Sequence, residues 1–385
     1  MTSENFTQFD ELQKAEGADA MLDTLIKTLR DQKEYHPLFE ALLMKKKHQL
    51  GLPIVRPTSF DDVPPDRHDE FERSYVQCAR ETGQGLLDEG KLSEAWIYFR
   101  TIREPEAVAA AIDQITPRTE ADEETEEIIK IALYEGANPV QGLAFMLESQ
   151  GTCSTITALS QQLPNLDPED RKRAAAMMVK KIYGDLCQSI NQEVQNRLGT
   201  AASSHSLREL MTDRDWLFAE GNYHTDVSHL NSVVQFARSL DSSRSELELA
   251  IELAEYGSKL DEKLQYPGDP PFEEFYPAHL HYLNALAGKD QDRAIVYFRG
   301  KLEPEQDDSK KQLIAYVIVE LMGHIGKMDQ ALDLAERFLK DVDESSGFSF
   351  TQLCVQADRM DTLQRVSKEQ GNLVRYAAAL IQGQA

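Results

Sequence analysis

Three residues in one short stretch, His224, Asp226 and His229, have side chains of the types that bind zinc or iron. On a continuous helix, the second and third of these residues would point about 200° and 140° away from the first, because the helix turns once in about 3.6 residues. The three side chains therefore converge only if His224 precedes the helix. Alternatively, Asp226 caps the helix by accepting a hydrogen bond from the backbone amide of Ser228 or His229. The cap explains Asp226 without a metal.

Cys153 is the second candidate for chemistry. It lies in Gly-Thr-Cys-Ser, and a cysteine at the start of a helix becomes more reactive. A thiol nucleophile also needs a histidine base and an orienting acid, which the sequence does not place beside it. His279 and His281 form a His-x-His pair, which diverges on a helix because residues two apart point in different directions. We therefore assign no catalytic residue, metal ligand or cofactor.

The segment from Lys45 to Arg67 is expected to be structural. Lys45, Lys46 and Lys47 lie near the end of an expected helix, where the helix dipole favours cations. The following residues 51–65 contain four prolines and should form an irregular loop. Asp66 is then expected to cap a helix that starts near Arg67.

The net charge limits the classes of partner. Lys and Arg number 41 against 66 Asp and Glu, which gives a formal charge of −25. An acidic protein is repelled by nucleic-acid phosphates and by anionic membranes, so neither is expected as a partner. A basic or neutral protein or peptide is compatible with this charge, although acidity also serves solubility alone. The run Glu120–Glu127 is either a solvated helix start or a docking patch for a basic partner.

The cysteines and the first residues bear on the compartment. Cys78, Cys153, Cys187 and Cys354 are far apart and form no C-x-x-C pair, so a disulfide framework or structural zinc site is not expected. The opening Met-Thr-Ser-Glu-Asn-Phe-Thr lacks the basic and apolar regions of a signal peptide. No apolar run is long enough to span a bilayer. We expect a cytoplasmic protein.

The chain repeats one of its own segments. Ala95–Pro105 aligns without a gap on Ala294–Pro304, with identical Ala, Tyr, Phe, Arg, Glu and Pro. A looser third copy occupies Gly326–Ala335. Such repetition indicates stacked helical hairpins. Ala95 and Ala294 should be buried where two helices cross, with Phe99 and Phe298 beside them.

These segments resemble the tetratricopeptide repeat, which has glycines in its first helix and turn, and then a small and a large apolar residue in its second helix. The spacing is less regular than the family's period of about 34 residues. A further stretch, Tyr223–Leu230, resembles bacterial helical-repeat proteins and implies no function. The residues that carry the repeat resemblance are Gly83, Leu86, Gly90, Ala95, Phe99, Ala294, Phe298, Gly326, Ala331 and Ala335.

The sequence thus predicts an all-α fold, a tetratricopeptide-like α-solenoid of antiparallel helix pairs. A division into two helical-repeat regions, 1–198 and 206–385, would fall at the small, polar residues 199–205. Before it, Asp167 and Pro168 should start a long helix that ends at Leu198. The proline- and aromatic-rich residues 265–277 either line a groove or pack over helix ends.

Two functions remain open. The preferred one is a non-enzymatic scaffold whose helical repeats bind a protein or peptide. The alternative is a metal-dependent or cysteine enzyme, with a pocket near His224, Asp226 and His229 or near Cys153.

Overall fold

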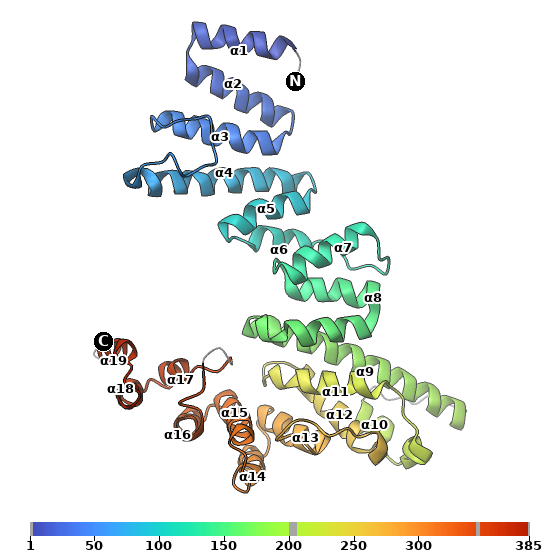
Figure 1. The fold of residues 1–385 in the computed structure, drawn as a ribbon. Helices are drawn as coiled ribbons and strands as arrows, with labels where there is room; N and C mark the ends of the chain where they lie inside the picture. The colour runs from blue at the N-terminus through green and yellow to red at the C-terminus, as the bar shows by residue number, and fades with distance from the viewer. Residues whose placement is uncertain (1–2, 200–205, 344–346, 384–385) are drawn as a thin grey trace. The chain divides into compact units, whose positions relative to one another are not determined.

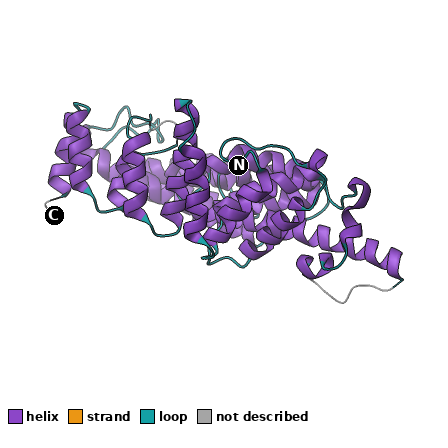
Figure 2. Ribbon diagram, turned by 90° about the horizontal axis from the view of Figure 1, so that it is seen from below, coloured by secondary structure: helices purple, strands orange, loops and turns teal. Residues whose placement is uncertain are grey.

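The part of the fold that the structure describes consists of helices and the turns and loops between them. The structure is a computed structural model that describes residues 3–199, 206–343 and 347–383, and every regular element in those residues is helical (Figures 1 and 2). The all-α class expected from the sequence is confirmed. Within the same residues, no helix is both long enough and apolar enough to cross a membrane.

The chain divides into two compact units, Met1–Thr155 and Ile156–Ala385. The boundary expected from the sequence, residues 199–205, lies outside the described residues except for Gly199. Helix α8 contains the division between the two units and is interrupted at Gly151, whose φ is 82°. The helices up to that division are α1 (Ser3–Ala15), α2 (Ala18–Asp31), α3 (Tyr35–Gln49), α4 (His68–Asp88), α5 (Leu92–Ile102), α6 (Glu106–Asp113), α7 (Glu123–Ile129) with a π-helical turn (Lys130–Tyr134), and α8 (Pro139–Gln162).

The second unit holds the remaining helices. They are α9 (Pro168–Leu198), α10 (Leu207–Met211), α11 (Val227–Phe236), α12 (Glu246–Ser258), α13 (Phe275–Leu286), α14 (Gln291–Leu302), α15 (Asp308–His324), α16 (Met328–Phe338), α17 (Phe350–Gln356), α18 (Met360–Glu369) and α19 (Leu373–Gln382). Short 3₁₀ helices occupy Pro65–Arg67, Leu163–Asn165, Asp215–Gly221, Ala237–Ser239 and Glu262–Leu264.

The start and end of α9 follow directly from its sequence. The Asp167 carboxylate accepts hydrogen bonds from the backbone amides of Glu169 and Asp170, both at 2.9 Å, and Pro168 occupies the first helical position. Proline is suited to that position because its missing N–H would have no partner there. The helix ends at Leu198, as the sequence predicts. It packs against α10, α11 and α12.

Tight turns join consecutive helices into hairpins. Gly90 and Gly326 have φ values of 74° and 76°, a left-handed conformation that glycine adopts without steric cost. The amide of Lys91 then donates to the Leu86 carbonyl at 2.9 Å, and that of Lys327 donates to the Met322 carbonyl at 2.8 Å. These bonds satisfy carbonyls at the end of one helix while the next helix begins immediately. The two hairpins, α4 with α5 and α15 with α16, pack along their lengths.

Within helix pairs, aromatic rings lie directly over glycines. A Cβ atom on Gly83 of α4 would lie 2.7 Å from the Phe99 ring of α5. A Cβ on Gly257 of α12 would lie 2.0 Å from the Tyr276 ring of α13. Any side chain at these positions would occupy the volume of the ring, so glycine permits the close approach of the two helices.

The two repeated segments are buried in α5 and α14. Ala95 and Phe99 are 0% and 2% exposed, and Ala294 and Phe298 are 1% and 0% exposed. Phe99 lies over a glycine, whereas Phe298 packs against the rings of Phe272 and Tyr282, with centroids 5.6 and 6.2 Å apart. Ala331, from the looser copy, is fully buried in α16.

In the second unit, each helix from α13 onward contacts its neighbours in sequence. Helix α13 packs on α12 and α14, and it also contacts α15. The contacts between successive helices continue from α14 with α15 to α18 with α19. Figure 1 shows α13, α15 and α17 in one row, with α14 and α16 below them. The helices of one row can therefore share a surface.

The Lys45–Arg67 segment agrees with the sequence prediction in part, since Lys46 and Lys47 lie in the last turn of α3 and residues 51–64 form an irregular loop. The Lys47 ammonium is completely buried and donates to the backbone carbonyls of Arg56 and Ser59, at 2.7 and 2.8 Å, and to the Asp62 carboxylate at 2.6 Å. It therefore also anchors the proline-rich loop to α3, a role that the sequence did not indicate. The cap predicted at Asp66 is wrong, because Arg67 occupies the N-cap of α4 without a side-chain hydrogen bond.

The contact between Gly257 and Tyr276 gives a prediction for stability. Gly257→Ala should lower the free energy of unfolding by about 1–3 kcal/mol, because the methyl group overpacks a full interface. Gly184→Ala in α9 is the matched control, since a Cβ there meets no atom within 4 Å. It should leave stability unchanged or raise it by about 0.5–1 kcal/mol, because alanine favours the helix. Urea denaturation followed by circular dichroism measures both, and equal effects of the two substitutions would contradict the packing described.

Candidate functional site

The predicted metal-ligand stretch forms a helix start. The Asp226 carboxylate accepts hydrogen bonds from the amides of Ser228 and His229, at 2.8 and 3.2 Å, and caps α11. The Ser228 hydroxyl donates to the same carboxylate, which lowers the pKa of Asp226. The backbone N–H of His224 donates to the Tyr256 hydroxyl at 2.9 Å, and the His224 ring Nδ1 lies 3.1 Å from that hydroxyl. Asp226 thus has the capping role that the sequence offered as the alternative.

The other candidates lie on other helices. Cys153 is exposed on α8, just after the break at Gly151. His279 and His281 point to different neighbours, because His279 is buried between Phe272 and Phe275 while His281 stacks on Tyr297 at 4.2 Å. Across the residues that the structure describes, no group of three or more His, Cys, Asp and Glu side chains could hold a metal ion.

A cavity of about 390 Å³ opens instead beside His279, and we call it the Arg238 cavity. Helices α11, α13 and α15, the turn after α11, and the loop before α13 all contribute to its walls. It includes part of the aromatic segment 265–277, which lines a groove and also packs on helices, since the Phe272 ring lies against His279 of α13 and Phe298 of α14. The lining residues are Asn231, Gln235, Arg238, Tyr266, Pro267, Gly268, Asp269, Pro270, Phe272, Phe275, His279, Leu313, Tyr316, Val317 and Glu320.

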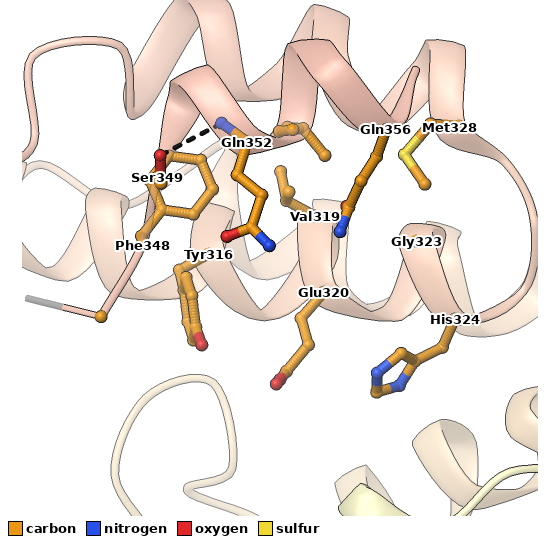
Figure 3. A pocket seen from close by; sticks show the side chains of 12 residues that line it. Tyr316, Val319, Glu320, Gly323, His324, Met328, Phe348, Ser349, Gln352 and Gln356 are labelled. Carbon is orange, nitrogen blue, oxygen red and sulfur yellow. Dashed lines mark hydrogen bonds between the residues drawn. The ribbon is translucent and has the colours of Figure 1, made fainter. Parts of the chain in front are cut away.

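A second cavity, of about 490 Å³, adjoins the Arg238 cavity, and we call it the Gln352 cavity. Tyr316 and Glu320 line both cavities. We call the two cavities together the α15 groove. In Figure 3, Gln352 and Gln356 extend from α17 toward α15, which carries Tyr316, Glu320 and His324 in a row. The remaining lining residues are Val319, Gly323, Met328, Gly347, Phe348, Ser349 and Leu353.

The floor of the Arg238 cavity combines buried rings with one cation. The guanidinium of Arg238 lies over the Phe272 ring, 4.7 Å from its centroid. The ring of His279 is 1% exposed, and its Nδ1 is 2.7 Å from the Phe275 carbonyl oxygen. Burial, with a smaller effect of Arg238, lowers the pKa of His279 to about 3. His279 is therefore a neutral side chain at physiological pH.

Two tyrosines, Tyr282 and Tyr316, lie near the Glu320 carboxylate. The fully buried Tyr282 hydroxyl donates to the Glu320 carboxylate at 3.3 Å. Burial raises the pKa of Tyr282, and the neighbouring Glu320 charge raises it further. Burial and Glu320 also raise the pKa of Tyr316, against the opposing charges of Arg171 and Arg238. Both phenols therefore remain protonated donors near neutral pH.

The acidic run lies in the first unit, at the start of α7. The Asp122 carboxylate accepts from the Thr125 amide at 2.9 Å and caps this helix. Arg118 donates to Glu124 at 2.7 Å. The carboxylates line a shallow surface hollow that contains Asp122, Glu123, Glu124, Glu126, Glu127 and Lys130.

The sequence did not identify the α15 groove. Tyr316, Glu320 and His324 are spaced four apart, which places them on one face of α15. That spacing is visible in the sequence and indicates a polar stripe on an apolar helix. Which other helices face the stripe depends on tertiary packing, so Arg238 and Gln352 could not be associated with it.

Comparisons with protein-family models, with curated proteins and with solved structures found no match to this chain.

Burial of His279 predicts a pH-dependent stability. Its pKa is about 3 in the folded state, against an ordinary value of 6.5, so below about pH 6.5 the unfolded chain binds the proton that the folded chain excludes. This residue therefore destabilises the fold increasingly as pH falls from 6.5 toward 3, with a limiting slope of about 1.4 kcal/mol per pH unit. In His279→Phe this contribution is absent. The free energy of unfolding, measured by denaturation of both proteins between about pH 7 and pH 5, should therefore change less steeply with pH in the variant than in the wild type. Identical slopes would contradict a neutral, buried His279.

Proposed function

We propose that this chain is a non-enzymatic interaction module that binds an extended segment of a protein or peptide in the α15 groove. The observation that carries the proposal is the composition of the groove. Its walls come mainly from α11, α13, α15 and α17, with Met328 from the start of α16, and α13 and α15 also contact each other. A surface built from successive helices of one row is suited to an elongated ligand.

The helix pairs support a tetratricopeptide-like α-solenoid as the architecture behind this surface. Two glycine-terminated turns, at Gly90 and Gly326, occur in segments of the repeat. The repeated Ala–Phe pairs are buried in both α5 and α14. We propose that the stacking of such pairs places α13, α15 and α17 on the binding side. The scattered cysteines favour a cytoplasmic location for the module.

The chemistry of the groove suits a peptide backbone. Gln352 and Gln356 are exposed amides on α17, opposite Tyr316 and Glu320 (Figure 3). Amide side chains both donate and accept hydrogen bonds, as a peptide group requires. Aromatic residues such as Tyr316 and Phe348 supply apolar contact area with few rotatable bonds.

Filling the groove tests this function. A Cβ on Gly323 of α15 meets no atom within 4 Å, so Gly323→Tyr can fold while its ring occupies the Gln352 cavity. Peptides selected on the wild-type chain from a random displayed library should bind this variant at least about tenfold more weakly, which corresponds to about 1.4 kcal/mol.

Gly300→Tyr provides the matched control. Gly300 lies on α14, outside both cavities, and a Cβ added to it would also meet no atom within 4 Å. The affinity of the Gly300→Tyr variant for the same peptides should stay within about twofold of that of the wild type. Equal affinity of the Gly323→Tyr variant and the wild type would contradict binding in the groove.

The acidic run gives a separate prediction about association. Replacement of Glu123, Glu124, Glu126 and Glu127 by Gln should slow association with a basic peptide and leave the fold intact, because exposed charges mainly steer encounter. The effect should fall as salt rises, since the screening length is about 8 Å at physiological ionic strength. Stopped-flow association at two salt concentrations measures it. A rate that responds to neither salt nor substitution would mean that the acidity serves solubility alone.

A further inference from the structure

Glu320 occupies the centre of the α15 groove. Glu320 and Tyr316 are the two lining residues that the cavities have in common. The Glu320 carboxylate accepts one hydrogen bond, from the Tyr282 hydroxyl at 3.3 Å. Within the part of the chain that the structure describes, no Lys, Arg or His nitrogen lies within 4.0 Å of this carboxylate. Glu320 therefore has hydrogen-bonding capacity left for a ligand.

Carboxylates outnumber cations by one among the Asp, Glu, Lys and Arg side chains that line the groove. Arg238 is the cation among the lining residues, and Asp269 and Glu320 are carboxylates. The guanidinium of Arg238 is held over the Phe272 ring instead of forming an ion pair with Glu320. The formal charge of −25 on the whole chain has the same sign. Local and overall charge both favour a cationic ligand group.

Aromatic surface lies beside the carboxylate. Tyr316 precedes Glu320 by four residues on α15, so their side chains are neighbours on the helix. The Phe348 ring meets Tyr316 edge-on, with centroids 6.1 Å apart. The aliphatic stems of Lys and Arg pack on such rings while the charged end reaches a carboxylate.

We propose that Glu320 and Tyr316 form a subsite for a basic side chain, Lys or Arg, of the extended segment bound in the groove. This proposal rests on the proposed function, because it requires that the segment occupy the α15 groove. Glu320 accepts the charged hydrogen bonds, the Tyr316 ring contacts the aliphatic stem, and Gln352 and Gln356 bond to the adjoining backbone.

The test is a selection from a random displayed peptide library on the full chain, followed by binding measurements with synthetic peptides. Wild-type protein should enrich sequences with Lys or Arg at one position. Glu320→Gln keeps an acceptor for Tyr282 but removes the charge, and it should weaken binding of these peptides about tenfold. Glu303→Gln is the matched control, because Glu303 is exposed at the end of α14 and outside both cavities. It makes the same change in net charge and should alter affinity by less than about twofold.

A peptide in which the enriched basic residue is replaced by Gln completes a double-mutant cycle. It should bind the wild type and Glu320→Gln equally, because the interaction is then already lost. Equal losses from Glu320→Gln with both peptides would overturn the subsite. Peptides that Gly323→Tyr blocks but that lack an enriched basic residue would overturn the subsite and leave the proposed function standing. Failure to select any peptide that Gly323→Tyr blocks would overturn both.

Discussion

The packing of aromatic rings over glycines sets how closely neighbouring helices approach. Helix α4 shows the constraint on two sides, since Gly83 lies under Phe99 of α5 and a Cβ on Gly85 would lie 2.2 Å from the Tyr35 ring of α3. The two glycines are two residues apart, which places them on different faces of the helix. One helix can thus pack closely against both of its neighbours, and any larger residue would force them apart.

The same constraint reaches the α15 groove in the second unit. Tyr276 packs over Gly257 and donates from its hydroxyl to the Asn231 side-chain oxygen at 2.5 Å. Asn231 lines the Arg238 cavity, and Tyr276 lies on α13, which also carries His279. The contact that joins α12 to α13 therefore also fixes a wall of the cavity. Because core packing tolerates little change in volume, the shape of the groove depends on residues that no ligand would touch.

Local features were predictable from the sequence, and features that depend on distant partners were not. The cap at Asp167 and the end of α9 at Leu198 follow from short-range rules, and the cap at Asp226 follows from the same rules. The anchoring role of Lys47 was not predictable, because its acceptors lie nine to fifteen residues away, in a loop without periodicity. The groove was missed because helix periodicity gives the exposed face of α15 but not the helices that face it. Burial of Lys47 and the position of Glu320 are both tertiary properties.

Amide hydrogen exchange of the full chain, with and without a peptide selected on it, tests the central claim most directly. Binding in the α15 groove should slow exchange in α11, α13, α15 and α17 and leave α14 and the part of α16 beyond Met328 unchanged, because ordered ligand contacts suppress local opening. Protection confined to α14 and α16, or to the acidic start of α7, would contradict the account and place the ligand on a different surface.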